Sequence, residues 1–242
     1  HAAYTSPAMN ATGPLVARWL TLERAPVEAG ARQHATVELA NAGTAPWRTL
    51  RLAYHWLDDR GNPIVWDGER TPLARTIDPG ETVRHDIAIR GPIPPGRYRL
   101  AVDLVQEGRF WLAELGNDPL EEDVDVVPRD PRGARAFLPE DAEPAADWHD
   151  RVRDLHAQGY AAVGGAVAAR RPSAGLAPYA PGGGRHPRFP HPLVCPSLLP
   201  PLEPNDEIDG LPAYRPEGDE EPWMFDGRIV LRLRSRSGRR RG

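Results

Sequence analysis

The fold of the first half of the chain is decided by three segments: NAGTAPW at residues 41–47, LRLAYHWL at 50–57 and PIVWDGERTPL at 63–73. Each contains one tryptophan. In the middle segment, alternate positions share one face and carry the large apolar side chains of Leu50, Leu52, Tyr54 and Trp56, while Arg51 and His55 share the other face. This period of two indicates a β-strand. We therefore expect a strand edge, a central strand and a crossing strand of a β-sandwich.

The same alternation continues on both sides of these segments. It occurs in residues 15–22, 33–40, 82–89, 97–106, 110–114 and 121–127. Turn-forming residues separate the runs, as in Asp58–Asn62 and in the Asp-Pro-Gly-Glu sequence at 78–81. Seven or eight short strands at regular spacing are typical of an immunoglobulin-like sandwich, which needs roughly a hundred residues. The prediction is a mainly β protein with an immunoglobulin-like antiparallel β-sandwich at residues 12–128.

Three short motifs in this half resemble a known group of modules. They are Asn-x-Gly-Thr-x-x-Trp at 41–47, Pro-Gly-Glu before a strand at 79–81, and Pro-Gly-x-Tyr-x-Leu at 95–100. Together they resemble the Ig-like β-sandwich modules of bacterial envelope and secreted proteins, of the kind found beside glycosyltransferases. The first motif is also similar to the Ig-like domain of autophagy cargo receptors. The resemblance implies a module that binds or positions without catalysis, in an extracellular or cell-envelope location, and it supplies no site residues.

The second half of the chain has a different composition. Pro131, Pro139 and Pro144 punctuate residues 129–144, which we expect to be a linker. Within 145–242, Trp148, Val152 and Leu155 follow helical spacing and Gly159 supplies a stop, so a short helix is predicted at 145–158. A long, irregular Pro/Gly-rich segment follows, then a terminal strand near 227–234 that pairs with a sheet edge, and an Arg-rich tail. Five large side chains are expected to anchor the irregular segment to the sandwich or the helix: Phe189, Leu193, Leu198, Trp223 and Phe225.

The composition excludes several mechanisms. All 30 basic residues are arginine, so a Schiff-base lysine and the lysine of a phosphate-binding loop are both absent. Cys195 is the single cysteine, so no internal disulfide can form. The net charge of −4 gives no general attraction for polyanions, and no apolar run has membrane-spanning length. We find no strong nucleic-acid signal and expect no membrane segment within this chain.

Three groups of residues that could carry chemistry are better explained by structural roles. Cys195 follows His186 and His191 at a spacing that matches no zinc pattern, and its apolar neighbours predict a buried thiol. The acidic clusters lie in turns or exposed runs, which are typically solvated. The glycine runs Val163-Gly-Gly165 and Gly182-Gly-Gly184 lack the dinucleotide-binding fingerprint and are expected at bends or close approaches of the backbone. We therefore expect no catalytic residue, no metal and no cofactor.

The tryptophans provide the candidate ligand site. Trp47 and Trp56 are predicted in the core, because tryptophan is largely buried on average. Trp66 and Trp111 each stand in a short strand beside polar loop residues, where partial exposure favours stacking on a sugar ring. The candidate ligand-binding residues are therefore Trp66, Trp111, Asp67 and Arg70.

These observations favour a non-catalytic binding or scaffolding module of a bacterial envelope or secreted protein, associated with glycan. Its partner would be a glycan or another protein. Two alternatives stay open at this point. In the first, the chain is an accessory or partial region of a glycosyltransferase or glycan hydrolase, so enzyme status stays open. In the second, the chain is an interaction protein whose Arg-rich tail binds an anionic polymer or lipid.

Overall fold

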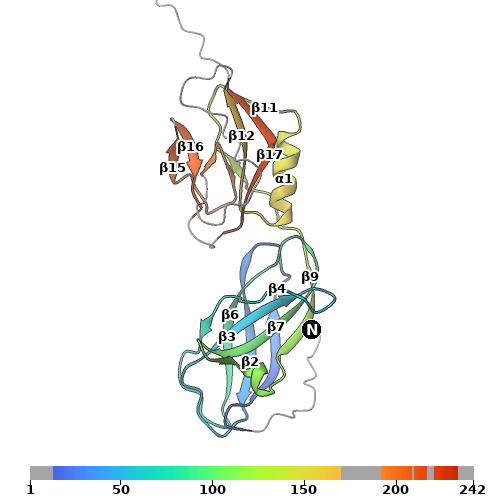
Figure 1. Ribbon diagram of the computed structural model, residues 1–242, viewed down its shortest axis with the longest axis vertical. Coiled ribbons are helices and arrows are strands. Elements are labelled where there is room, and N and C mark those ends of the chain that lie inside the picture. Colours follow the sequence, from blue (N-terminus) through green and yellow to red (C-terminus); the bar gives the residue numbers. More distant parts are fainter. Residues whose placement is uncertain (1–12, 170–191, 209, 217–220, 234–242) are drawn as a thin grey trace, which may run out of the picture. The chain divides into compact units, whose positions relative to one another are not determined.

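The computed structural model describes residues 13–169, 192–208, 210–216 and 221–233. The chain divides into two compact units, His1–Val127 and Pro128–Gly242, each with its own sheets (Figure 1). Several features expected from the sequence lie outside the described residues: Phe189, His186, His191, the glycines at 182–184 and the Arg-rich tail.

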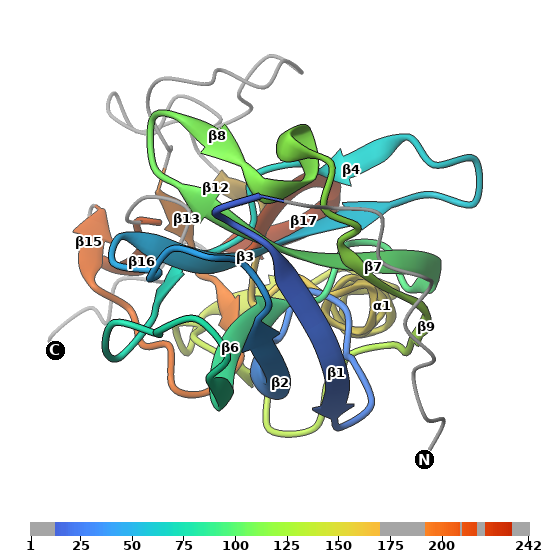
Figure 2. The same ribbon diagram turned by 90° about the horizontal axis from the view of Figure 1, so that it is seen from below.

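The first unit is an antiparallel β-sandwich, as predicted. One sheet has the order β1 (Ala17–Arg24), β2 (Arg32–Asn41), β6 (Thr82–Arg90). The other has the order β4 (Pro63–Val65), β3 (Leu50–Leu57), β7 (Gly96–Gln106), β8 (Phe110–Trp111). Two further strands join this second sheet, β5 (Thr71–Pro72) beside β3 and β9 (Leu120–Val126) beside β7, and the short 3-10 helix η1 (Leu112–Leu115) follows β8. Figure 2 shows the strands of the two sheets from below.

Strand β3 holds the two sheets together. Trp56 is fully buried, and its indole N–H donates a hydrogen bond of 2.8 Å to the carbonyl of Arg90 in the opposite sheet. The Tyr54 hydroxyl accepts a bond of 2.9 Å from the Arg90 amide. The apolar bodies of both rings lie in the core, and the polar group of each ring is hydrogen-bonded to the backbone of β6. The prediction that Trp47 and Trp56 belong to the core is confirmed.

The Asn-x-Gly-Thr motif builds the turn that leads into Trp47. Asn41 is buried, and its amide nitrogen donates to the carbonyls of Ala45 and Ile77, both at 3.0 Å. Its side-chain oxygen accepts a bond from the Gly43 amide. A Cβ at Gly43 would lie 2.3 Å from the Pro14 carbonyl oxygen, so the position accepts only glycine without a backbone shift.

The second unit has three layers within itself. Its larger sheet has the order β10 (Arg135–Ala136), β14 (Ser197–Leu198), β12 (Ala162–Ala169), β17 (Trp223–Leu233), β11 (Ala142–Pro144). Its smaller sheet has the order β13 (Leu193–Val194), β16 (Leu211–Tyr214), β15 (Asp206–Ile208). Helix α1 (Trp148–Gln158) packs on Val163 and Ile229 of the larger sheet, while the neighbouring Ala162 packs with Leu193 and Tyr214 of the smaller one. The segment 129–144, expected as a linker, contributes β10 and β11 to the larger sheet.

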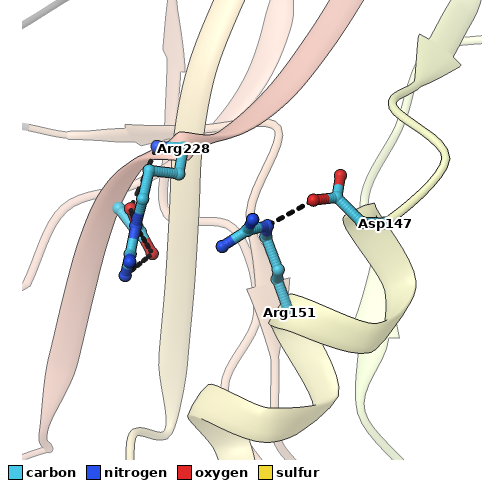
Figure 3. A network of polar contacts seen from close by, with 4 residues as sticks. Asp147, Arg151 and Arg228 are labelled. Atoms are coloured by element: carbon cyan, nitrogen blue, oxygen red, sulfur yellow. Dashed lines mark hydrogen bonds and ion pairs between the residues drawn. The ribbon is translucent and has the colours of Figure 1, made fainter.

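The predicted helix is present, with one ion pair at its first turn and a second ion pair on β17. Asp147 precedes the helix and pairs with Arg151 one turn later at 2.5 Å (Figure 3). Arg228 of β17 pairs with Asp226 at 2.7 Å, and its hydrogen bonds lower the pKa of that carboxyl. Because the Arg228 side chain is largely exposed, this pair contributes little to stability.

Several expectations for the second unit need correction. The described part of the Pro/Gly-rich segment is not purely irregular, because it forms four short strands, β13 to β16. Strand β17 does not pair with a sheet edge; it lies inside the sheet, parallel to β12 and antiparallel to β11. Leu193 and Leu198 are buried, but together with Phe225 they pack on Ala162 and Tyr214 and not in the core cluster of the sandwich or of α1. Trp223 is 37% exposed. Strand β12 was not predicted, because its sequence AVGGAVAA shows no polar alternation and its Ala and Gly residues have low β propensity.

The two glycines of β12 let this strand lie close to β17 and to β13. A Cβ at Gly165 would lie 2.2 Å from the carbonyl oxygen of Ile229 in β17. A Cβ at Gly164 would lie 2.9 Å from the Cβ of Leu193 in β13. The expectation that this Gly-Gly pair marks a close approach of the backbone is confirmed.

Replacing Trp56 with alanine should lower the free energy of unfolding by about 3–5 kcal/mol, because it leaves a cavity in the core and removes the bond to Arg90. Urea denaturation of the full chain measures the change. Trp223→Ala is the control, since it removes the same side chain from an exposed position. Equal stabilities for the two variants would contradict the placement of Trp56.

Gly165→Ala should destabilise the second unit by roughly 3 kcal/mol, since the new methyl group meets a backbone atom that cannot rotate away. Gly227→Ala in β17 is the matched control, because its Cβ would meet only Phe225 at an ordinary 3.7 Å. Thermal unfolding followed by circular dichroism compares the two variants. A larger loss in Gly227→Ala would show that the β12–β17 contact is not as close as described.

Candidate ligand-binding site of the first unit

His55 is the centre of the candidate site. In β3, Tyr54 and Trp56 point into the sandwich core, so the side chain of His55 points to the outer face of the sheet. It is nevertheless only 6% exposed, because two aromatic rings cover it. The imidazole lies 4.2 Å from the ring of Trp66 and 4.3 Å from that of Trp111, between ring centroids. A histidine on the outer face of a strand thus supports both tryptophans.

Trp66 is held firmly although much of it is exposed. Its ring stacks on His55 with an interplanar angle of 25°, and its backbone carbonyl accepts a short hydrogen bond from Nδ1 of the same histidine. The side chain is 53% exposed. One face of the indole is therefore supported by the imidazole, and a large part of the ring remains open to solvent.

Trp111 forms the second aromatic wall. It meets Trp66 edge to face, with 6.2 Å between the ring centroids. The Arg70 guanidinium lies 4.6 Å from the centroid of the Trp111 ring, a distance that gives a cation–π contact. Trp111 is half-buried, so it contributes less open surface than Trp66.

The segment from Asp67 to Arg70 supplies the polar groups. Arg70 donates to the Asp67 carboxylate at 2.7 Å and to the Gly68 carbonyl at 2.6 Å, and it lies 3.4 Å from a carboxylate oxygen of Glu107. The Gly68 amide bonds to the Tyr54 carbonyl at 3.0 Å. A Cβ at Gly68 would lie 2.4 Å from that same oxygen, so glycine lets this segment lie flat against β3.

Burial shifts the pKa of two ionisable groups on the outer face of this sheet, His55 and Asp103. Burial lowers the pKa of His55 from its usual range, and the nearby Arg70 charge lowers it further, so His55 is neutral at pH 7. Asp103, on β7, is buried, and burial raises the pKa of its carboxyl to about 6. Its carboxylate accepts bonds from the amides of Leu104 and Ala113.

The four residues predicted from the sequence, Trp66, Trp111, Asp67 and Arg70, therefore lie in one cluster. Sequence reasoning missed two residues beneath them. His55 was assigned to the polar face of its strand together with Arg51, which gave no sign of its burial. Asp103 carried a signal that was available, because a lone carboxylate interrupts the apolar run Leu100–Val105.

A serine–histidine pair in the second unit has a structural role. His156 Nε2 lies 2.9 Å from the Ser197 hydroxyl, and Nδ1 lies 2.8 Å from the Tyr160 carbonyl. Both side chains are buried, so a substrate has no access to the hydroxyl. Nδ1 is occupied by the Tyr160 carbonyl and not by a carboxylate, whereas a catalytic triad needs an orienting carboxylate and an accessible nucleophile. The pair instead ties α1 to β14.

Cys195 is a buried thiol, as the sequence predicts. Its side chain is 4% exposed, and burial together with the charge of Asp141 raises its pKa to about 11. A thiol of this kind is a poor nucleophile at neutral pH. Among the residues that the structure describes, no three His, Cys, Asp or Glu side chains gather as metal ligands do. Within the same part of the chain, no helix is long and apolar enough to cross a membrane.

Comparisons with known proteins give similarity of fold alone. No family model matches the chain, and no curated protein matches it. The C-terminal domain of Wzt is similar over 48% of this chain and 75% of its own, at 7% identity and a TM-score of 0.34. A CARDB domain from Pyrococcus furiosus covers 48% of this chain and 96% of its own, at 14% identity and a TM-score of 0.31. The sporulation control protein Spo0M of Bacillus subtilis is similar over 55% of this chain and 60% of its own, at 16% identity and a TM-score of 0.33. Similarities this remote carry no argument about function.

The thiol of Cys195 should react slowly with Ellman's reagent at pH 8 in the native chain. A pKa near 11 in place of 9 leaves ~100-fold less thiolate, and burial slows the reaction further. Because the chain has one cysteine, the absorbance of released thionitrobenzoate reports on Cys195 alone. The chain unfolded in urea is the control and should react at the rate of a free thiol. Equally fast reaction of the native chain would contradict the burial of this residue.

Proposed function

We propose that the first unit is a non-catalytic binding module whose ligand is a glycan, bound against Trp66. One observation carries the proposal: the Trp66 indole is more than half exposed and yet is fixed by its stack on His55 and by the bond to its carbonyl. A flat apolar surface that is already ordered loses little conformational freedom on binding. The apolar face of a pyranose ring matches such a surface.

The polar groups around the rings suit neutral sugar hydroxyls. Asp67 has a side chain that is 72% exposed, and it can accept hydrogen bonds from hydroxyl groups beside Trp66. Asp67 and Glu107 contribute two negative charges, Arg70 contributes one positive charge and His55 is neutral, which leaves one net negative charge. This balance favours a neutral glycan over an acidic one, since like charges repel at close range.

The location follows from the resemblance of the sequence motifs. The Asn-x-Gly-Thr-x-x-Trp and Pro-Gly-x-Tyr-x-Leu steps together resemble modules of bacterial envelope and secreted proteins, where glycans are abundant. We propose the same extracellular or cell-envelope setting for this chain, with a glycan or a glycan-bearing protein as its partner.

Trp66→Ala should abolish most of the binding to neutral polysaccharide. Truncation of a central aromatic contact commonly costs more than about 1 kcal/mol, so we expect roughly a tenfold rise in the dissociation constant. Native gel electrophoresis through dextran, mannan or laminarin measures the retardation of the chain. Trp223→Ala removes an exposed tryptophan from the other unit, and Cys195→Ser alters a buried thiol; both should bind as the unchanged chain does.

Two results would contradict the proposal. One is equal retardation of the Trp66→Ala variant and the unchanged chain by every polysaccharide that binds. The other is the absence of retardation by all three. Release of reducing sugar during the assay would instead support the alternative that the chain is part of a glycan hydrolase.

A further inference from the structure

Asp103 lies on the same outer face of the sheet as His55. In the β3–β7 pair, Asp103 is opposite Ala53 and Ala101 is opposite His55. The neighbours of Asp103 in β7, Val102 and Leu104, belong to the sandwich core, so the carboxylate points away from it. Asp103 is 2% exposed. The outer face of the sheet therefore has two buried polar residues, one on each of the two central strands: His55, which contacts both tryptophans, and Asp103.

The carboxylate of Asp103 joins β7 to η1. One oxygen accepts a hydrogen bond of 2.7 Å from the Leu104 amide, and the other accepts one of 3.1 Å from the Ala113 amide. Ala113 belongs to the first turn of η1, and Trp111 is the residue directly before that helix. The Trp111 amide is bonded in turn to the Glu114 carboxylate at 3.1 Å. The turn that presents Trp111 is thus held by one buried and one exposed carboxylate.

We infer that Asp103 is a positioning residue for the aromatic site: it fixes the first turn of η1, so that Trp111 stands against His55 and Trp66, and it makes this placement depend on pH. The inference rests on the proposed function only where binding is concerned. The placement of Trp111 itself can be measured without any ligand.

The pH dependence follows from the chemistry of the carboxyl group. The ionised form accepts both N–H donors, whereas the protonated form carries an O–H on one oxygen and loses acceptor strength there. Burial, aided by the negative charge of Glu114, raises the pKa of Asp103 to about 6. Above pH 7 the carboxylate is ionised and holds η1, and as the pH falls through 6 its hold weakens. The other charged or titratable groups on this face are Arg51 and His55 on β3, Arg97 and Arg99 on β7, Glu121, Asp123 and Asp125 on β9, and Glu114 on η1. Asp67, Arg70 and Glu107 add three charged groups at the aromatic cluster.

The test labels the seven tryptophans with 5-fluorotryptophan and follows the fluorine NMR spectrum of the ligand-free chain from pH 8 to pH 4.5. Trp111→Phe identifies the Trp111 signal. We expect this signal to shift with a midpoint near pH 6 in the unchanged chain, and the transition to be absent in Asp103→Asn. A transition that persists unchanged in Asp103→Asn would overturn the inference and assign the titration to another group, such as His55.

Glu114→Gln is the second variant, and it remains informative if Asp103→Asn fails to fold. Glutamine keeps an acceptor for the Trp111 amide but removes the negative charge beside Asp103. The midpoint of the Trp111 signal should therefore move to lower pH. An unmoved or higher midpoint would contradict the coupling between the two carboxyl groups.

Binding provides a third readout. Retardation by dextran, mannan or laminarin should weaken about fivefold to tenfold between pH 7.5 and pH 5, because protonation weakens one hydrogen bond and a typical hydrogen bond is worth about 0.5–1.5 kcal/mol. In Asp103→Asn it should be weak and independent of pH over the same interval. Retardation of the unchanged chain that stays constant over this interval would contradict the dependence of Trp111 placement on Asp103. If no polysaccharide binds while the Trp111 signal still titrates through Asp103, the proposed function fails and the positioning role stands.

Discussion

The burial of strand β3 on both of its faces is the constraint on which the first unit depends. Its inner face places Tyr54 and Trp56 in the core and bonds both of them to the backbone of Arg90 in the opposite sheet. Its outer face places Ala53 and His55 beneath a cover formed by the segment after β4 and by Trp111. In a sandwich, an outer face normally meets water and carries polar residues. The segment after β4 and Trp111 therefore form an additional layer over the outer face of β3, which the core itself does not need.

That extra layer explains why the candidate site is rigid. A tryptophan on a solvent-exposed loop ordinarily has rotational freedom, which binding must remove. Here the loop is tied to β3 at Gly68, its arginine is held by Asp67 and by the Trp111 ring, and its tryptophan rests on an imidazole. The conformational cost of ordering the ring is met during folding, when the outer face of β3 is covered. Stability and ligand presentation in this unit therefore share the same contacts.

Features that depend on residues close together in the sequence were predicted, and features that depend on contacts between distant segments were not. Alternation along single strands identified the sandwich and the inner face of β3, because that pattern reports burial of one face. The four residues of the candidate cluster were identified by their type and their loop context. The burial of His55 was not predictable in this way, since it depends on residues 66 and 111 folding back over one strand from different parts of the chain. Strand β12 was not predicted for a different reason. Its run of Ala and Gly has low β propensity, and its stability comes from pairing with β14 and β17 on either side.

The neutrality of His55 links these points to the chemistry of the site. Its Nδ1 must carry a proton, because the partner is a carbonyl oxygen, which can only accept. With the imidazole neutral, Nε2 is then without a proton. A second proton would place a cation close to the Arg70 guanidinium, which already lies over the Trp111 ring. The two positive charges would compete for the same aromatic surface, and burial would add the cost of desolvation. A neutral imidazole is therefore the form that lets Arg70 close over Trp111 while Trp66 stays stacked and open, so one uncharged histidine permits both the cover of β3 and the exposed ring.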